Sequence, residues 1–452
     1  MARARRYGRL PCMSARPTNS SNVTIPRIAE RIAEAGGRAL IVGGSVRDDL
    51  LGRPFRDRDV EVLGLTLEAL AELLAEFGRP HQVGRSFANL RLSGLDVDFS
   101  VAESPELDFA GAARRRDLTV NSMAMDPLSG EALDPYGGRE DLVARRLRAT
   151  DPQRFGDDPL RGLRTGRMAA ELEMEPDPEL VALCAAQDLS TVAPERIFDE
   201  LCKGLLSARR PSRLFDFLEE TGLLRYFPEL DALGGVPQDP RWHPEGDVWI
   251  HTLMVVDEAA RLREGVEDGL ALMFGALCHD LGKPESTRGE KGRVLAHGHE
   301  NQGVEVTRRF LEGIRAPVKL VRKVSGLVQH HLAPALYPRN DAGARGYRRL
   351  ARKLAEAGLS MELLAELARA DQLGRTTEAA LTRQFPDGER FLEAARALGV
   401  SQQATPDAVL GRHLLARGLQ PGPGFSEILE RCRNDQDETG ETDPERILER
   451  VL

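Results

Sequence analysis

One stretch decides the fold of the N-terminal part of the chain: Ile41-Val42-Gly43-Gly44-Ser45-Val46-Arg47-Asp48-Asp49-Leu50-Leu51-Gly52, followed by Asp57-Arg58-Asp59-Val60-Glu61-Val62. Residues 39–42 predict a buried strand, and residues 45–51 predict a helix directly after the paired glycines. Glycines let backbone N–H groups close around a phosphate, and the N-terminus of a helix favours an anion. The turn therefore suits a triphosphate.

Two carboxylates follow this turn in a second predicted strand. Asp57 and Asp59 are two residues apart, so their side chains lie on the same side of the strand. There they can share divalent cations that lie against the triphosphate. Gly-Gly alone is usually a tight turn and Asp-x-Asp alone is common in loops, but the order strand, turn, helix, strand joins the two. The combination predicts metal-assisted transfer of a nucleotide.

A third carboxylate is expected on a neighbouring strand. Residues 90–92 and 95–99 alternate apolar and polar residues around Ser93-Gly94, which predicts a hairpin. Asp96 and Asp98 would then lie on one face of its second strand. Either of them can supply the third carboxylate, and the alternative is an edge strand with a solvated acidic face.

The whole chain has the composition of a globular protein with several domains. Its 452 residues are 41% hydrophobic and 29% charged, which suggests roughly two to four domains. The sequence contains no run of 18 apolar residues, so we expect no membrane span. The net charge of −9 gives no support for nonspecific nucleic-acid binding, so any RNA-binding surface must be local. The five cysteines form no C-x-x-C pair, which favours reduced thiols and a cytoplasmic setting and argues against structural zinc.

The two ends of the chain differ in character. Residues 1–23 are rich in arginine and contain no acidic residue. A basic, disordered arm is the preferred interpretation, with an organellar transit peptide as the alternative. Beyond residue 152 strand signals fade, and helical periodicity continues to the C-terminus.

The motif Gly-Gly-x-Val-Arg-Asp-x-Leu-Leu-Gly followed by Asp-x-Asp resembles the class II tRNA nucleotidyltransferase and poly(A) polymerase family. The resemblance implies a head like that of DNA polymerase beta, with Mg²⁺ at its carboxylates and the nucleotide at the turn. Residues 115–124 resemble the family segment Arg-Arg-Asp-Phe-Thr-Ile-Asn-Ala. There an arginine meets the triphosphate and an aspartate and an asparagine meet the ribose, and an arginine-rich solvated turn is the alternative. The residues so implicated are Gly43, Gly44, Arg47, Arg116, Asp117 and Asn121 for the nucleotide, and Asp57, Asp59 and Asp98 for catalysis.

Residues 155–167 resemble the family's Glu-Asp-x-x-Arg helix. Asp158 and Arg161 are three residues apart and so lie on one helix face. A carboxylate accepts from the amino group of cytosine or adenine and a guanidinium donates to the adjacent ring nitrogen, so this pair can admit CTP and ATP and reject GTP and UTP. The alternative is an intrahelical ion pair. Further nucleotide contacts are expected from Arg164 and Arg167 on the same helix.

This helix departs from the family pattern. Asp157 stands where glutamate is usual, and Gly162 and Gly166 replace larger residues. Interior glycines lower helix stability. We therefore expect a looser helix than in relatives.

His251, His279-Asp280 and Asp371 match the ordered ligands of the HD metal-dependent phosphohydrolase superfamily. Imidazoles with carboxylates suit magnesium or a transition metal, and Mg, Mn or Ni is expected at this site. The alternative for a histidine on an apolar helix is a hydrogen-bonded core residue. Four further histidines are available to extend the site: His297, His299, His330 and His331.

Together these patterns predict an α+β multidomain protein with a nucleotidyltransferase head and an all-α body. The expected divisions are a basic arm at 1–23, the head at 24–151, a helical nucleotide- and RNA-binding region at 152–235, an HD domain at 236–385 and a helical tail at 386–452. The expected function is addition of CCA to the 3′ end of tRNA from CTP and ATP. The alternatives are addition of CC or A only, poly(A) synthesis, or an HD phosphohydrolase whose head merely binds RNA. The sequence assigns no oligomeric state.

Overall fold

The computed structural model describes residues 24–54, 58–83, 89–93, 95, 97–290 and 293–452. The expectations for Asp57, Asp96 and the arm at residues 1–23 lie outside these residues. The chain forms two compact units, one up to Leu142 and the other from Val143 onward.

The first unit is built on a seven-stranded sheet with the order β3-β4-β5-β2-β1-β6-β7. All neighbouring strands are antiparallel except β2 and β5, which are parallel. The strands are β1 (Arg38–Val42), β2 (Arg58–Leu63), β3 (Pro80–Val83), β4 (Asn89–Leu92), β5 (Val97–Val101), β6 (Ala124–Met125) and β7 (Ala132–Leu133). The predicted hairpin at residues 90–99 is confirmed by the antiparallel pairing of β4 with β5.

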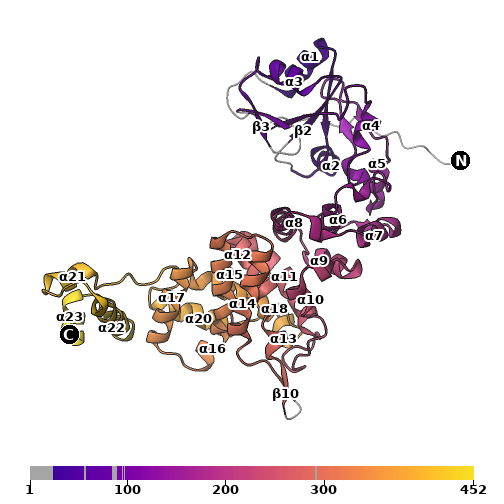
Figure 1. Cartoon of the computed structure of the whole chain (residues 1–452). Helices are drawn as coiled ribbons and strands as arrows, with labels where there is room; N and C mark the ends of the chain where they lie inside the picture. Colours follow the sequence, from indigo (N-terminus) through magenta and orange to yellow (C-terminus); the bar gives the residue numbers. More distant parts are fainter. Residues whose placement is uncertain (1–23, 55–57, 84–88, 94, 96, 291–292) are drawn as a thin grey trace. The chain divides into compact units, whose positions relative to one another are not determined.

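Short helices surround this sheet. They are α1 (Ile25–Glu34), α2 (Gly44–Leu50), α3 (Leu67–Leu74), α4 (Phe109–Ala113), the 3-10 turn η1 (Thr119–Asn121) and α5 (Gly138–Ala144). In α1 the residues Ile25, Ile28, Ala29 and Ile32 recur at helical spacing and are buried, so this face packs against β1 and α3 (Figure 1). Their burial fixes the sheet that carries the glycine turn.

The second unit is mainly helical. Its helices are η2 (Phe155–Asp157), α6 (Leu160–Leu172), α7 (Pro178–Ala185), η3 (Leu189–Thr191), α8 (Pro194–Ser207), α9 (Ser212–Glu220), η4 (Leu223–Tyr226), α10 (Pro228–Asp231), α11 (Val248–Leu262), η5 (Arg263–Gly265), α12 (Gly269–Cys278), α13 (Lys283–Ser286), α14 (His299–Gly313), α15 (Val318–His330), α16 (Ala333–Arg339), α17 (Ala344–Ala357), α18 (Met361–Leu373), α19 (Glu378–Leu381), α20 (Pro386–Ala397), α21 (Gly411–Ala416), α22 (Pro423–Thr439) and α23 (Pro444–Val451). The predicted α/β head followed by a helical body is thus confirmed.

One hydrophobic core runs from α6 to the end of α20. Aromatic pairs connect its parts: Phe198 stacks on Phe274 at 5.8 Å between ring centroids, and Phe215 meets the edge of Trp249 at 6.2 Å. Helix α12 is apolar on nearly every side and is buried along most of its length, as expected for a central helix. The helices on either side of residue 235 therefore share one core.

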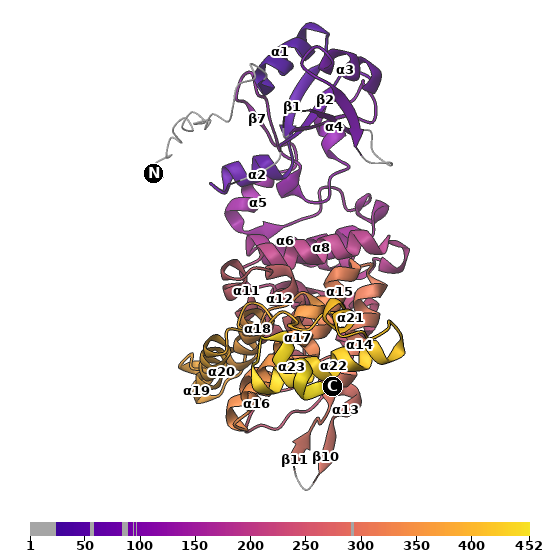
Figure 2. The same ribbon diagram turned by 90° about the vertical axis from the view of Figure 1, so that its left-hand side faces the viewer.

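Smaller features complete the second unit. Two pairs of short strands occur among its helices: parallel β8 (Arg146–Leu147) and β9 (Glu175–Pro176), and antiparallel β10 (Arg288–Glu290) and β11 (Arg293–Leu295), which extend from the helices (Figure 2). Helices α21 to α23 have a core of their own, and Arg352 of α17 donates to Asp437 of α22 at 2.8 Å. Among the helices of the described residues, none is both long and apolar enough to cross a membrane.

Candidate functional site

The glycine turn lies between β1 and α2. Gly43 has φ 75°, a conformation that favours glycine. A Cβ atom built on Gly43 would lie 3.2 Å from Nη1 of Arg116 and 3.7 Å from Oδ2 of Asp59. Any larger residue would therefore crowd the space between a guanidinium and a carboxylate. The structure brings Asp59 and Arg116 to the turn, as the sequence predicts.

Asp98 lies beside Asp59 on the neighbouring parallel strand. The two residues are register partners of β2 and β5, so their side chains leave the sheet on the same face. Asp98 accepts two hydrogen bonds from Arg91 of β4, at 2.6 Å from Nε and 2.7 Å from Nη2. Its carboxylate is therefore held in place next to the exposed end of β2.

Glu61 is a site residue that the sequence reasoning missed. It follows Asp59 by two positions on β2 and is fully buried. Arg116 donates to its Oε2 at 2.8 Å, and Arg115 donates to its Oε1. Burial alone would raise the pKa of Glu61, but the attraction and hydrogen bonds of the two arginines lower it. The alternation Asp-x-Asp-x-Glu at residues 57–61 is the sequence pattern that could have identified Glu61 as a site residue.

A second network joins α2 to the segment after Arg116. Nη1 of Arg47 donates to Oδ1 of Asn121 at 2.7 Å, and Nδ2 of Asn121 donates to Oδ1 of Asp117 at 3.0 Å. Arg47 also donates to both oxygens of Asp48. A Cβ on Gly44 would lie 3.4 Å from Nη2 of Arg47. The structure thus gathers the predicted ribose and phosphate contacts around one turn.

In the second unit, Asp158 has extended backbone two positions before α6 begins, and Arg161 is the second residue of α6, so the expectation that the pair lies on one helix face is wrong. Oδ2 of Asp158 accepts from Nη2 of Arg196 at 2.7 Å, and Oδ1 accepts from the backbone N–H of Leu160 at 3.2 Å. Nη1 of Arg161 donates to the carbonyl of Arg154 at 2.6 Å. Helix α8, which carries Arg196, therefore holds the Asp158 carboxylate from outside α6.

Arg164 and Arg167 lie further along α6, and Arg167 is buried. Nε of Arg167 donates to Glu200 of α8 at 2.5 Å. Burial would raise the pKa of Glu200, but the charges of Arg167, Arg164 and Lys203 lower it. In this structure the Arg167 guanidinium joins α6 to α8, and its expected nucleotide contact stays a prediction.

The two unusual glycines of α6 face other helices. A Cβ on Gly166 would lie 2.8 Å from Cδ1 of Phe217 and 3.0 Å from Cδ1 of Leu214. A Cβ on Gly162 would lie 3.0 Å from Cδ1 of Leu223. The glycines therefore allow close packing of α6, a role that the expectation of a looser helix did not include.

A cluster of imidazoles and carboxylates occupies the middle of the second unit. His251 of α11, His279 and Asp280 can offer one metal-ligand atom each within a common sphere. Nε2 of His279 lies 3.1 Å from Oδ2 of Asp280, and Nε2 of His251 lies 3.1 Å from Oδ1 of Asp371 on α18. The four residues predicted from the sequence are thus brought together. Nε2 of His279 is buried without a hydrogen-bond partner, as a metal ligand would be before its ion binds.

Two of the four additional histidines join this cluster. His299, His331 and Asp280 form a second possible ligand group. Nε2 of His299 lies 3.3 Å from Oδ1 of Asp280. His297 and His330 belong to none of the ligand groups found in the described part of the chain.

Backbone and carboxylate partners orient these imidazoles. Nδ1 of His279 lies 2.8 Å from the carbonyl of Ala276, and Nδ1 of His251 lies 2.8 Å from Oε1 of Glu245. Both contacts lie on the Nδ1 side of the ring, so Nε2 is the atom left available to a metal. Glu245 is a supporting residue that sequence reasoning missed, since its motif shows no separate signal.

Charged neighbours keep the carboxylates ionised. Burial raises the pKa of Asp280, but His279 and Lys283 hold it well below its usual range. For Asp371 burial likewise opposes ionisation, and Arg375 lowers the pKa well below the usual range. Nζ of Lys283 lies 2.6 Å from Asp280, and Nη2 of Arg375 donates to both oxygens of Asp371 at 2.9 Å.

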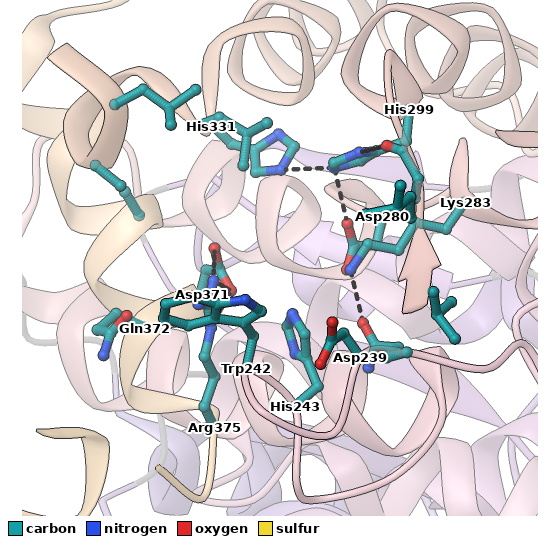
Figure 3. A pocket seen from close by; sticks show the side chains of 18 of the residues that line it. Asp239, Trp242, His243, Asp280, Lys283, His299, His331, Asp371, Gln372 and Arg375 are labelled. Atoms are coloured by element: carbon teal, nitrogen blue, oxygen red, sulfur yellow. Dashed lines mark hydrogen bonds and ion pairs between the residues drawn. The ribbon is translucent and has the colours of Figure 1, made fainter. Parts of the chain in front are cut away.

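A pocket of about 310 Å³ opens onto this cluster (Figure 3). Asp280, His299, His331 and Asp371 contribute to its wall, and Trp242 lines its outer part. Lys283, Arg339 and Arg375 add positive charge to the lining. Three carboxylates, Asp239, Asp280 and Asp371, line the same pocket, so a bound metal ion would supply the excess positive charge that a small anionic ligand requires.

Three family models match the chain. The poly A polymerase head domain matches residues 39–148, the probable RNA and SrmB-binding site of polymerase A matches residues 174–233, and the HD domain matches residues 248–374. Nucleotidyltransferases of this kind and HD proteins depend on metal ions, in agreement with the ligand groups above.

Relatives and solved structures agree with these models. The chain is 35% identical over 389 residues to the multifunctional CCA protein of Cupriavidus metallidurans, covering 78% of this chain and 88% of the relative. The crystal structure of the Bacillus stearothermophilus CCA-adding enzyme in complex with CTP matches with a TM-score of 0.66 at 23% identity, covering 95% of this chain and 98% of that chain. The Thermotoga maritima CCA-adding enzyme complexed with tRNA matches with a TM-score of 0.59 at 19% identity, covering 94% and 93%. The chain therefore belongs to the multifunctional CCA protein family, class II tRNA nucleotidyltransferases that combine a poly(A) polymerase head with an HD domain.

Proposed function

We propose that this protein adds the sequence CCA to the 3′ end of tRNA from CTP and ATP without a nucleic-acid template. One observation carries the proposal: the Asp59 carboxylate and the Arg116 guanidinium meet at the Gly43 turn. Carboxylates that hold cations, next to a phosphate-binding turn, are what nucleotidyl transfer requires. The 35% identity to a multifunctional CCA protein supports tRNA as the acceptor.

In the proposed reaction the terminal 3′-hydroxyl of tRNA attacks the α-phosphate of the nucleotide, and pyrophosphate leaves. Asp57 and Asp59 would hold Mg²⁺, which supplies activation of the hydroxyl and stabilisation of the leaving oxygens. Asp98 would complete the carboxylate set. Arg116 would bind the triphosphate, and Asp117 and Asn121 would position the ribose.

Base selection is proposed for Asp158 and Arg161. Asp158 would accept from the exocyclic amino group of cytosine or adenine, and Arg161 would donate to the neighbouring ring nitrogen. GTP and UTP would place a carbonyl against the carboxylate, which costs roughly 1–3 kcal/mol for each unpaired buried group. The bonds from Arg196 to Asp158 support this role, because they hold the carboxylate in a fixed position.

The remaining expectations belong to this proposal. We place the protein in the cytoplasm and retain the domain divisions at 24–151, 152–235, 236–385 and 386–452. The helical regions would recognise the tRNA acceptor arm by shape and phosphate contact, as is usual for double-stranded RNA. Because the net charge is −9, that contact must use a local positive surface.

A phosphohydrolase activity of the HD domain is the second proposal. The pocket next to the imidazole and carboxylate cluster, with Lys283, Arg339 and Arg375 in its lining, supports it. His251, His279, Asp280 and Asp371 would hold Mg, Mn or Ni, which supplies Lewis-acid activation of a phosphoester. Lys283 and Arg375 would bind the phosphate oxygens.

The test uses purified protein and tRNAs that lack none, one or all three of the terminal nucleotides, with each NTP added singly and with CTP and ATP together. We expect incorporation of C and then A, loss of incorporation in Asp59→Asn, and retained incorporation in His279→Ala and Asp280→Ala. Incorporation of C alone or A alone would contradict the proposal and indicate partial addition. Long A tracts would contradict it and indicate poly(A) synthesis. An Asp59→Asn variant as active as wild type would favour an HD phosphohydrolase with an RNA-binding head.

A further inference from the structure

We propose that helices α15 and α17 carry a binding surface for the phosphate backbone of tRNA. This α15–α17 basic surface consists of Lys319 and Arg322 on α15 and of Arg349 and Lys353 on α17. The proposal rests on the proposed CCA addition, because that function makes tRNA the acceptor. It gives the region that matches the HD domain, residues 248–374, a part in holding RNA that is separate from its candidate metal ligands.

The charge of this part of the sequence is opposite to that of the whole chain. Residues 313–355 contain ten lysines and arginines and one acidic residue, Asp341. Ten positive charges against one negative charge give the segment a formal net charge of +9, whereas the whole chain has −9. Positive charge concentrated in one part of an acidic protein is the electrostatic pattern of a nucleic-acid contact.

Carboxylates neutralise some of these cations but leave the α15–α17 basic surface uncompensated. Its four side chains are exposed, and none of them forms an ion pair with a described residue. Other cations of the segment do have acidic partners. The pairs are Lys323 with Asp268, Arg339 with Asp387, Arg345 with Glu438, and Arg352 with Asp407 and Asp437.

The packing of the two helices brings the four exposed cations together. A Cβ atom on Gly326 of α15 would lie 3.1 Å from Cβ of Ala357 on α17, so the helices are in close contact there (Figure 1). The two α15 cations lie seven and four residues before Gly326, and the two α17 cations lie eight and four residues before Ala357. Residues at such spacings share a helix face. All four cations therefore lie along the line where α15 meets α17.

This arrangement is unfavourable in the protein alone and favourable next to a polyanion. Arg349 and Lys353 are four residues apart, and like charges at that spacing destabilise a helix. A phosphate backbone removes the repulsion, and its bound counterions are released when the cations replace them. Double-stranded RNA is recognised mainly by its shape and its phosphates, so a helical arm of tRNA is the ligand that this surface fits.

Binding of tRNA at several salt concentrations tests the proposal without nucleotide transfer. Fluorescence anisotropy measures the dissociation constant of labelled tRNA without its terminal CCA, with the full-length protein and no CTP or ATP. Removing one phosphate contact reduces the slope of log affinity against log salt by about 1. We expect this reduction in Arg322→Ala, Arg349→Ala and Lys353→Ala, with binding roughly 5- to 10-fold weaker at about 0.1 M salt.

Arg396→Ala is the matched control, because the Arg396 side chain on α20 is 60% exposed and lies outside the basic segment. It should bind tRNA with the slope of the wild type. Unchanged slopes in all three surface variants overturn the proposal. Variants that lose binding to phosphatidylglycerol vesicles but keep that of tRNA also overturn it, in favour of a membrane partner. Far-UV circular dichroism verifies the fold, and glutamine replaces any alanine that prevents folding.

The same measurements separate this proposal from CCA addition. Asp59→Asn should bind tRNA like the wild type, since its carboxylate belongs to the head. A wild type that incorporates no nucleotide, with surface variants that bind tRNA weakly, would support the α15–α17 basic surface and contradict CCA addition. A wild type that adds CCA, with surface variants that bind tRNA normally, would contradict the surface alone. In active protein the surface variants should raise KM for tRNA and leave KM for CTP unchanged.

Discussion

Glu61 links the acidic strand β2 to the two arginines that follow the head's last long strand. Its carboxylate is fully buried and bonded to Arg115 and Arg116, while Asp59 two positions earlier is exposed. The same strand therefore presents one carboxylate to the site and uses another to hold the guanidinium that would bind the triphosphate. Glu61 is a positioning residue in this account.

Substitution Glu61→Gln should raise KM for both CTP and ATP. The amide cannot accept charge-assisted bonds from both arginines, and such bonds are worth about 1.5–3 kcal/mol. We expect KM to rise roughly 10- to 100-fold, with a smaller change in kcat. Steady-state incorporation into tRNA measures both constants. Glu34→Gln alters an exposed carboxylate of the same unit and should behave like wild type; equal KM values for the two variants would contradict the role of Glu61.

Arg196→Ala should relax nucleotide selection although Arg196 is not proposed to touch the base. Removing it frees the Asp158 carboxylate from its two bonds. We expect the preference for CTP over UTP to fall by roughly 10-fold, which corresponds to a loss of about 1.4 kcal/mol in the free energy of discrimination. Competition between labelled CTP and UTP measures the preference. Arg209→Ala is the control, since this arginine is 85% exposed and pairs with Glu173; selection unchanged in both variants would exclude a role for Arg196.

Much of the site was predictable and some of it was not. Gly43 and Asp59 follow from a motif whose spacing is local, and the structure joins them as expected. Glu61 was missed because an acidic residue in a strand normally faces solvent, and only the distant arginines explain its burial. Only the structure shows that His331 belongs to a metal-ligand group and that its neighbour His330 does not, because adjacent helical residues point in different directions.

Helix α6 depends on glycine for its close contact with α9. Gly166→Ala should gain about 1 kcal/mol from helix propensity but lose more from overlap with Phe217 and Leu214. We expect net destabilisation of about 1–2 kcal/mol, seen as a lower Tm of the helical unit in calorimetry. Gly313→Ala is the control, because its Cβ would meet nothing within 4 Å. A Gly166→Ala variant more stable than wild type would show that Phe217 and Leu214 can move to accommodate the added methyl group.

The junction of α6 with α8 should depend on pH through Glu200. The pKa of this buried carboxyl is lowered by Arg167, Arg164 and Lys203 from its ordinary value of 4.5. A carboxyl with a depressed folded-state pKa stabilises the fold above its unfolded-state pKa, and this stabilisation is lost as the pH falls through the folded-state value. Glu200→Gln should therefore be about 3–5 kcal/mol less stable than wild type at pH 7.

The difference in unfolding free energy between wild type and Glu200→Gln should shrink below pH 4.5, where the carboxyl of the unfolded chain takes up its proton. Urea unfolding followed by circular dichroism at several pH values measures it. A difference that stays constant down to pH 3 would assign the loss to packing instead of charge.

Local sequence patterns predict some elements of this fold, but they do not predict the pairing of strands that are distant in the sequence. The hairpin of β4 and β5 and the long helical body follow from local alternation and helical periodicity. The parallel pairing of β2 with β5, which sets Asp59 opposite Asp98, joins segments nearly forty residues apart and left no local signal. The hairpin of β10 and β11 was not predicted, because strands of three residues are too short to show a clear alternation of apolar and polar residues.

Among the described residues, a hydrophobic core lies in the head, another extends from α6 to α20, and a smaller one lies among α21 to α23. Metal binding to the HD cluster should stabilise only the second of these cores, because all its ligands come from that unit. Co²⁺ at 100 times its Kd should add about 2.7 kcal/mol to the unit's stability. Calorimetry with and without Co²⁺, with excess Mg²⁺ in both samples to occupy the carboxylates of the head, should show one transition moving and the transition of the head unchanged. In His279→Ala the shift should be smaller, and a shift of both transitions would refute the assignment.

The core shared by α6 and the metal-bearing helices has an evolutionary consequence. Phe215 and Phe198, which lie on helices that flank α6, pack on Trp249 and Phe274 of the helices that carry or precede the HD ligands. A lineage that does not need phosphoester hydrolysis can replace individual histidines, but it cannot delete these helices without exposing the apolar surfaces of α8 and α9, which flank α6. We therefore expect inactive descendants of this protein to keep the HD scaffold long after its metal ligands have drifted.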